Sequence, residues 1–391
     1  MKQYLEAAAA LPQDADRATL VGRVFVEGQG AVLVHVRPDG LFDLSSLAPT
    51  CSALLELKDP AAAVQAHKGA RVGNLPEVLR NSAQAARDVQ LPYLLAPCDL
   101  QAIKAAGVTF VASMLERVIE EQARGDPAKA LEVRKAVVAV IGENLAAVKP
   151  GSADAARLKD VLISQGVWSQ YLEVGIGPDA EIFTKSQPMS AVGTGADIGI
   201  HPKSEWNNPE PEIVLAVNSR GETKGATLGN DVNLRDFEGR SALLLGKAKD
   251  NNASCAIGPF IRLFDAHFGI DDVRRCDLAM KVEGTDGFVM NGSSSISKIS
   301  RDPLDLVSQA IGPNHQYPDG FVLFLGTMFA PVQDRRGPGQ GFTHEVGDVV
   351  TVTTPLLGTL ANRVDTSDRI APWTYGTSAL MRDLARRGLL N

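Results

Sequence analysis

Short apolar runs separated by glycine, proline and polar residues dominate the second half of the chain. Four of these runs lie at residues 213–217, 278–282, 321–325 and 349–353. Runs of this length, bounded by turn residues, are typical of β-strands. Helical patterns are few after residue 181, at 240–248, 303–311 and 378–387. The pattern therefore predicts a large β-dominated domain and not a doubly wound sheet.

The first half of the chain shows two other patterns. Residues 1–92 mix β-rich runs with short helical stretches, which predicts a small mixed α/β N-terminal domain. Residues 93–391 form the second predicted domain. Within it, residues 111–170 follow a helical period, with an apolar stripe that includes Met114 and Val118. We therefore expect an α+β fold, dominated by β-strands, with a helical insertion at about 111–170.

Composition and charge narrow the class of protein. The chain has 391 residues, of which 45% are apolar, enough for a sizeable core. Its net charge of −7 argues against a general nucleic-acid binder. The four cysteines are widely spaced and form no C-x-x-C pair. We find neither a convincing signal peptide nor an apolar stretch of membrane-spanning length, so we expect a cytoplasmic protein that does not bind membranes.

Two carboxylates stand immediately before the apolar run at 213–217. Glu210 and Glu212 are two residues apart, so in an extended strand their side chains point to the same face. Two like charges side by side are costly unless a cation or a shared proton offsets them. Oxygen ligands suit Mg²⁺, Mn²⁺ or Ca²⁺. The alternative is an edge strand with a solvated acidic face.

Asp231 is a third candidate ligand, in a strand-like context that follows residues 226–228. A buried aspartate needs a partner or a metal. Together with Glu210 and Glu212 it would supply three oxygen ligands and leave coordination positions open for water or substrate.

Further motifs, in the same order along the chain, resemble the fumarylacetoacetate hydrolase superfamily. They are Phe-x-Lys at 183–185, Glu-x-Glu at 210–212, Asn-Asp-Val-x-x-Arg-Asp at 230–236, Gly-Lys-x-x-Asp at 246–250, Gly-Pro-Phe at 258–260, Gly-Thr at 326–327 and Gly-Asp-Val-Val at 347–350. The resemblance covers roughly residues 94–116 and 181–365. It implies a mixed β-sheet roll and a metal-dependent enzyme that acts on a 2-keto or 1,3-diketo acid.

The resemblance also implies a set of site residues. Mg²⁺ is the implied cofactor, with Mn²⁺ or Ca²⁺ possible. The implied residues are, for the metal, Glu210, Glu212 and Asp231; for the substrate, Ser113, Lys185, Arg235 and Thr327; and for catalysis, Glu116 and Lys247. A loose alignment also allows Lys249, but the Gly-Lys-x-x-Asp spacing favours Lys247.

One position departs from the superfamily's hydrolases, which activate water with a histidine and a glutamate in Gly-x-Asn-Tyr-x-x-His-x-x-Glu. In this chain Ser113 stands at the histidine position and Glu116 at the glutamate position. A serine without an activating partner is a poor general base. Within the superfamily the chain resembles the bacterial dehydratases of 2-keto-3-deoxypentonates in oxidative pentose catabolism. Dehydration to 2-oxoglutarate semialdehyde needs no water nucleophile, and the D-xylonate-derived acid is the expected substrate.

Two alternatives stay open at this point. The first is a hydrolase or decarboxylase of an acylpyruvate-type diketo acid on the same fold. The second is a catalytically silent metal- or ligand-binding protein, which would be disfavoured if the three carboxylates and Lys247 converge on one pocket. The superfamily implies a homodimer or homotetramer.

Overall fold

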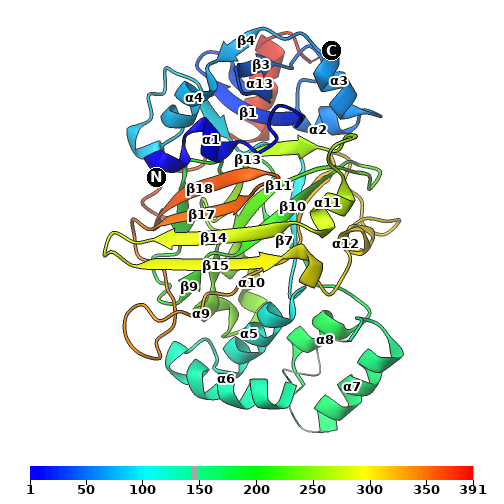
Figure 1. Cartoon of the computed structure of the whole chain (residues 1–391), viewed down its shortest axis with the longest axis vertical. Helices are drawn as coiled ribbons and strands as arrows, with labels where there is room; N and C mark the ends of the chain where they lie inside the picture. Colours follow the sequence, from blue (N-terminus) through cyan, green and yellow to red (C-terminus); the bar gives the residue numbers. More distant parts are fainter. Residues whose placement is uncertain (142–147, 165, 167, 391) are drawn as a thin grey trace.

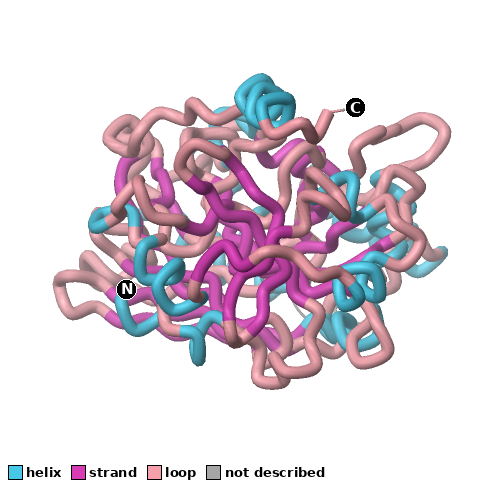
Figure 2. Tube along the Cα trace, turned by 90° about the horizontal axis from the view of Figure 1, so that it is seen from above, coloured by secondary structure: helices cyan, strands magenta, loops and turns pink. Residues whose placement is uncertain are grey.

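Two packed β-sheets form the core of the molecule, and the larger one extends to the end where the N-terminal strands lie (Figures 1 and 2). The computed structural model describes residues 1–141, 148–164, 166 and 168–390. Within these residues the larger sheet has eleven strands in the order β4-β3-β2-β1-β13-β11-β10-β16-β6-β7, with β5 paired to β1. The smaller sheet has the order β15-β14-β17-β18-β8. This architecture confirms the predicted β-dominated α+β fold.

The strand bounds are as follows. The larger sheet contains β1 (Leu20–Val26), β2 (Gly30–Arg37), β3 (Gly40–Asp43), β4 (Arg71–Gly73), β5 (Tyr93–Leu95), β6 (Ala102–Ala106), β7 (Ile182–Ser186), β10 (Pro211–Val217), β11 (Thr223–Asp231), β13 (Cys255–Leu263) and β16 (Phe321–Phe324). The smaller sheet contains β8 (Asp197–Ile200), β14 (Asp277–Glu283), β15 (Val289–Ser295), β17 (Val349–Thr354) and β18 (Gly358–Thr366). A separate pair joins β9 (Asn207–Asn208) to β12 (Asn233–Leu234).

Strand β10 lies at the centre of the packing, and both of its faces are buried. Ile213, Leu215 and Val217 point toward the smaller sheet and pack in one cluster with apolar residues of β14, β17 and β18. Val214 and Ala216 point to the opposite face, where each joins another cluster. Side chains alternate between the two faces of a strand. A strand buried on both faces therefore reads as a continuous apolar run, as residues 213–217 do.

The helices lie around the sheets. Outside the predicted insertion they are α1 (Ala7–Ala10), α2 (Cys51–Leu55), α3 (Pro60–Ala66), α4 (Leu75–Asn81), α9 (Arg235–Glu238), α10 (Leu245–Lys249), α11 (Ile270–Arg274), α12 (Pro303–Ala310) and α13 (Thr377–Arg386). The predicted insertion forms a helical unit of α5 (Val111–Gln122), α6 (Pro127–Ile141), α7 (Ala153–Ser164) and α8 (Gln170–Ile176). This unit lies at one end of the molecule, opposite the N-terminal strands and α13 (Figure 1).

The helical unit begins with an amphipathic helix. In α5, Met114, Val118 and Ile119 are buried in a cluster with residues of α8. Asp126 precedes α6, and its side chain accepts a hydrogen bond of 3.0 Å from the Ala128 amide. Such a bond satisfies an amide at the helix start that has no intrahelical partner.

The N-terminal strands continue the main sheet. Strand β1 pairs with β13, where Leu20 lies opposite Arg262 and Val21 opposite Ile261. Phe260 packs in the core cluster that β1 and β2 form. A domain boundary near residue 92 therefore stays a prediction, because hydrogen bonds cross between the two parts of the chain. No helix within the described ranges is both long enough and apolar enough to cross a membrane.

Candidate metal and catalytic site

Three carboxylates meet where β10 and β11 lie side by side. Glu210 directly precedes β10, Glu212 lies on it, and Asp231 ends β11. All three residues are buried, and each offers an oxygen within 4.8 Å of the others. The backbone holds this geometry, because the Asp231 amide donates to the Glu210 carbonyl at 3.0 Å. The structure thus brings the three predicted metal ligands together.

A glycine turn supports Glu212. The Gly326 amide donates to Glu212 Oε2 at 2.7 Å. Gly326 has φ +100°, and a Cβ there would lie 1.9 Å from Thr109 Oγ1. Only glycine fits such a backbone conformation and so close an approach. Burial, with Asp231 and Glu210 alongside, raises the pKa of Glu212 well above its usual range.

Two buried lysines face these acids. Lys249 Nζ lies 2.5 Å from Glu210 Oε2 and 3.0 Å from Asp231 Oδ2. Although burial alone would lower the pKa of Lys249, Asp231 and Glu210 raise it above its usual value. Lys185 Nζ lies 3.0 Å from Asp231 Oδ1 and also donates to the Lys249 carbonyl. Lys185 is fully buried and does not line the cavity, so its place behind Asp231 suits positioning rather than substrate contact.

The structure corrects the choice between the two neighbouring lysines. Lys247 is exposed, and its Nζ lies 5.6 Å from the centre of the Phe237 ring. Lys249, and not Lys247, reaches the carboxylates. Residues two apart on a helix do not share a face. The spacing Gly-Lys-x-x-Asp therefore pointed to the wrong side of α10.

Two arginines and two further glutamates lie next to the three carboxylates and form ion pairs with one another or with Glu210. Arg117 of α5 pairs with Glu210 and Glu120, and it lies 3.2 Å from Glu238. Arg235 Nε lies 3.2 Å from Glu120 Oε1 and donates to Asn208 Oδ1 at 2.9 Å. Arg235 does not line the cavity. Burial raises the pKa of Glu120 to about 7.

The cavity beside the carboxylates measures about 20 Å³, room for an ion or a water molecule. Ser113, Thr327 and Glu181 are among its lining residues. Ser113 Oγ donates to the Phe110 carbonyl at 2.9 Å, and Thr327 Oγ1 to the Phe329 carbonyl at 3.2 Å. The described residues that line the cavity include no histidine.

Glu181, the residue directly before β7, contributes a further carboxylate. An added Cβ at Gly107 would lie 1.8 Å from Glu181 Oε2, so glycine leaves the room that this side chain occupies. Burial, followed by the charge of Glu238, raises the pKa of Glu181 to about 7. A carboxyl group with such a pKa can both accept and donate a proton near neutral pH.

Glu116 lies outside this cavity. Its carboxylate accepts hydrogen bonds from Arg134 Nε at 3.0 Å and Arg134 Nη2 at 2.5 Å. The structure thus places the predicted proton carrier in an ion pair between α5 and α6. Glu181, and not Glu116, lines the cavity.

The donor set fits a hard divalent cation. All three converging ligands are carboxylates, the type of ligand that Mg²⁺, Mn²⁺ and Ca²⁺ prefer. The charged side chains around this site also include more acids than bases. Its acids are Glu120, Glu181, Glu210, Glu212, Asp231 and Glu238, and its bases are Arg117, Lys185, Arg235 and Lys249. A divalent cation would offset this excess of negative charge.

Sequence reasoning missed several of these residues. Arg117 follows Ser113 by four positions, a spacing that puts both on one helix face and so offered a signal. Lys249 was considered as an alternative to Lys247, but the Gly-Lys-x-x-Asp spacing favoured Lys247. Glu181 and Glu238 carry no motif of their own, and only the tertiary fold brings them to the carboxylates.

Comparisons with known proteins agree with this architecture. The family model described as fumarylacetoacetate (FAA) hydrolase C-terminal matches residues 166–365. A probable 2-keto-3-deoxyxylonate dehydratase of Haloferax volcanii is 32% identical over 196 residues, 50% of this chain and 64% of that protein. A 2-dehydro-3-deoxy-D-arabinonate dehydratase of Saccharolobus solfataricus is 33% identical over 184 residues, which are 47% of this chain and 58% of that protein. The chain thus spans less than two thirds of the length of these curated relatives.

Solved structures share the fold. A 2-keto-3-deoxy-D-arabinonate dehydratase complexed with magnesium and 2,5-dioxopentanoate superposes with a TM-score of 0.61 at 21% identity, over 89% of this chain and 99% of that one. A fumarylacetoacetate hydrolase from Exiguobacterium antarcticum gives a TM-score of 0.51 at 16% identity, over 89% of this chain and 100% of that one. The family model covers half of the sequence and includes all three converging carboxylates. The chain therefore belongs to the fumarylacetoacetate hydrolase family.

Proposed function

We propose that the protein is a metal-dependent dehydratase that converts a 2-keto-3-deoxypentonate, the D-xylonate-derived acid first, to 2-oxoglutarate semialdehyde. The observation that carries this proposal is the convergence of three carboxylates with Lys249 and Glu181 around one cavity. The printed activities of the two curated relatives support it. Ser113, whose hydroxyl donates to a backbone carbonyl, offers no activated water nucleophile, so elimination suits the site better than hydrolysis.

Glu210, Glu212 and Asp231 would hold the cation, with Mg²⁺ as the first candidate and Mn²⁺ or Ca²⁺ as others. The similar dehydratase structure that contains magnesium supports this choice. A divalent cation bound there would polarise the carboxylate and ketone oxygens of a 2-keto acid and make its C3–H bond more acidic.

Glu181 is the proposed proton carrier. As a carboxylate it would accept the C3 proton, and as a carboxylic acid it would return that proton to the C4 hydroxyl, which leaves as water. Its pKa of about 7 suits both roles. The resulting C3=C4 double bond then moves by proton shifts until C5 becomes an aldehyde.

Lys249 stays protonated in this scheme, because Asp231 and Glu210 raise its pKa. It would stabilise negative charge that develops on the substrate and would not act as a base. Ser113 and Thr327, at the cavity wall, would contact the substrate. Lys185 and Arg235 would act as positioning residues through Asp231 and Asn208. A cavity of about 20 Å³ is too small for a pentonate, so its walls must move when substrate enters.

Incubation with Mg²⁺ and 2-keto-3-deoxypentonate tests the proposal. Formation of the semialdehyde is followed with a coupled NAD⁺-dependent aldehyde dehydrogenase, for both C4 epimers. Turnover of at least one epimer that EDTA abolishes is the expected result. No product from either epimer would rule out the dehydratase.

Glu212→Gln is the matched test of the ligand assignment. Replacing a charged ligand with a neutral amide should lower turnover at least about 100-fold and weaken Mg²⁺ binding in calorimetry. Glu205→Gln, at an exposed position, is the control. Unchanged Mg²⁺ affinity in Glu212→Gln would contradict the assignment.

Such an enzyme would act in the cytoplasm on a small-molecule 2-keto acid. The homodimer or homotetramer that the superfamily implies remains a prediction. Light scattering coupled to gel filtration would distinguish the two states.

A further inference from the structure

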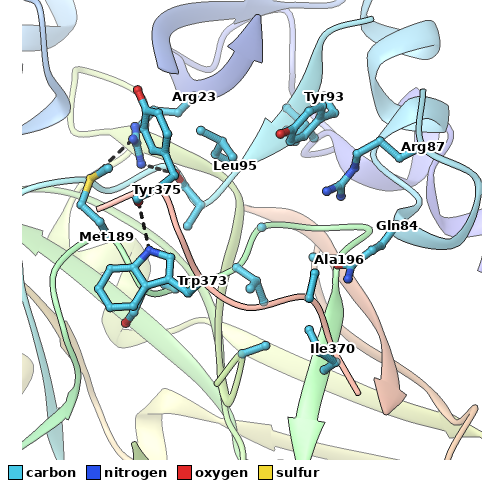
Figure 3. A pocket seen from close by; sticks show the side chains of 18 of the residues that line it. Arg23, Gln84, Arg87, Tyr93, Leu95, Met189, Ala196, Ile370, Trp373 and Tyr375 are labelled. Carbon is cyan, nitrogen blue, oxygen red and sulfur yellow. Dashed lines mark hydrogen bonds between the residues drawn. The ribbon is translucent and has the colours of Figure 1, made fainter. Parts of the chain in front are cut away.

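A second cavity lies where three separate stretches of the chain meet (Figure 3). It measures about 370 Å³, within the size range of small-molecule sites. Its walls come from the N-terminal residues 84–96, the loop at 189–196 with residues 252–253, and the C-terminal segment 370–375, together with Arg23. It shares no lining residue with the carboxylate cavity.

Arg87 supplies a positive charge at this cavity, and the carboxylate whose charge acts on it, Asp197, is itself paired with Arg363 at 2.8 Å. Its guanidinium lies 4.2 Å from the centre of the Tyr93 ring and donates to the Ser82 carbonyl at 2.9 Å. Its Nε atom is buried without a hydrogen-bond partner. Within the described part of the chain, no carboxylate forms an ion pair with Arg87. A half-buried cation in this state gains from an anionic ligand.

The rest of the lining favours a singly charged ligand with an apolar body. No aspartate or glutamate lines the cavity in the part of the chain that the structure describes. The other arginine, Arg23, is offset by Asp99 at 3.6 Å. Gln84 accepts a hydrogen bond from the Asp197 amide through Oε1, which leaves its NH₂ group as a donor beside Arg87. The polar end of the cavity therefore offers one cation and one amide donor.

The opposite side of the cavity is mostly apolar, and the one arginine on it, Arg23, is the one offset by Asp99 (Figure 3). Trp373, Tyr375 and Met189 lie across from Arg87 and Gln84 (Figure 3). Trp373 is 46% exposed at the cavity mouth, although its Nε1 donates to the Tyr375 carbonyl at 3.0 Å. Met189 has φ +70°, a conformation that persists only where the surrounding structure holds it. Such a fixed wall lowers the cost of ordering a ligand.

We propose that this cavity binds an organic monocarboxylate with a flat apolar body. The carboxylate would pair with Arg87 and accept a hydrogen bond from the Gln84 amide. The apolar body would lie against Trp373 and Tyr375. This second site is separate from the proposed catalytic centre and does not depend on the reaction carried out there.

Three probes of similar size and different charge test the proposal: 3-phenylpropionate, 3-phenylpropanamide and 3-phenylpropylamine. Their binding to the full chain is measured by calorimetry in EDTA, which removes divalent cations from the carboxylate site. The acid should bind about tenfold more tightly than the amide, because it gains a charge-assisted hydrogen bond, and the amine should bind least. Equal affinities for the acid and the amide would overturn the proposal.

Variants locate the binding. Arg87→Leu should abolish the preference for the acid, whereas Arg382→Leu, the same charge change at an exposed position, should retain it. Arg87→Lys, which keeps the charge, should retain part of the preference and guards against a folding defect in Arg87→Leu. Trp373→Ala should weaken the binding of the acid and of the amide to the same degree. The proposal is overturned if Arg87→Leu keeps the full preference for the acid. It is also overturned if Trp373→Ala leaves ligand binding unchanged and alters only the oligomeric mass measured by light scattering.

Discussion

Lys247 and Lys249 show how finely the site depends on single side chains. The two lysines lie on the one-turn helix α10, yet one reaches Glu210 and Asp231 while the other lies in solvent. A buried pair that loses one partner leaves an uncompensated charge. Making the same substitution at each position and comparing the effects therefore separates the roles of the two lysines.

Lys249→Met should lower turnover at least about 100-fold and lower the free energy of unfolding by about 3 kcal/mol. Lys247→Met should change the free energy of unfolding by less than about 0.5 kcal/mol, as expected for an exposed position. Coupled assays and urea denaturation measure both effects. Equal losses in the two variants would contradict the placement of Lys249.

His35 predicts how stability depends on pH. Burial, and then the charge of Arg37, lowers the pKa of His35 from its ordinary 6.5 to about 4. Between these values the unfolded chain binds the proton and the folded chain does not, so stability falls as pH drops from 6.5 toward 4. After allowance for partial exposure, we expect a loss of about 1 kcal/mol from His35 between pH 7 and pH 5.

His35→Gln removes this titration. In urea denaturation at pH 7 and pH 5, the variant should lose about 1 kcal/mol less than the unchanged protein. The exposed His267→Gln is the control. The same pH dependence in His35→Gln and the unchanged protein would refute the half-buried, neutral state of His35.

Local spacing was enough to predict the carboxylates but not their partners. Glu210 and Glu212 follow from strand alternation, and Asp231 from its strand-like context. Glu181 lies far from them in sequence, and its relevance depends on how β7 is placed beside β6 in the folded sheet. Lys185 was predicted from a motif, yet its burial behind Asp231 became visible only in three dimensions.

At the scale of elements, α5 links the helical unit to the metal-ligand cluster. Its Arg117 pairs with Glu210, Glu120 and Glu238, and each of these carboxylates is buried. The helix is thus held to the sheets by charge as well as by its apolar face.

Arg117→Met should lower the free energy of unfolding by about 3 kcal/mol, because it leaves buried carboxylates without their cation. Arg157→Met in α7 removes an exposed pair with Asp154 and should cost less than about 1 kcal/mol. Urea denaturation in EDTA compares the two variants. A similar, small effect of both would show that the Arg117 pairs do not stabilise the fold.

Pattern reasoning predicted whole elements better than their details. The four apolar runs of the second half became β10, β14, β16 and β17, because burial on one or both faces leaves a clear apolar signal. The predicted helix at 240–248 instead divides into a 3-10 turn at Ala242–Leu244 and α10. The short pair of β9 and β12 has no pattern of its own, since each has two residues and depends on the other for hydrogen bonds.

At the scale of the whole molecule, the shared sheet predicts cooperative unfolding. Strand β1 bonds to β13, and α13 packs on the N-terminal part from the far end of the sequence. Parts that share a sheet and a core do not open independently. Unfolding in urea should therefore give one transition, with the same midpoint by tryptophan fluorescence and far-UV circular dichroism. Two separated midpoints would show that the molecule does not unfold as one cooperative unit.

The pairing of β1 with β13 also limits how the protein can be engineered. Removal of residues 1–92 would expose Phe260, Ile261 and Leu263, which now pack against the N-terminal core. It would also turn β13, buried along its whole length, into a free sheet edge. Exposed apolar edges pair with other chains. A chain truncated to residues 93–391 should therefore aggregate, unless another segment or a partner covers this edge.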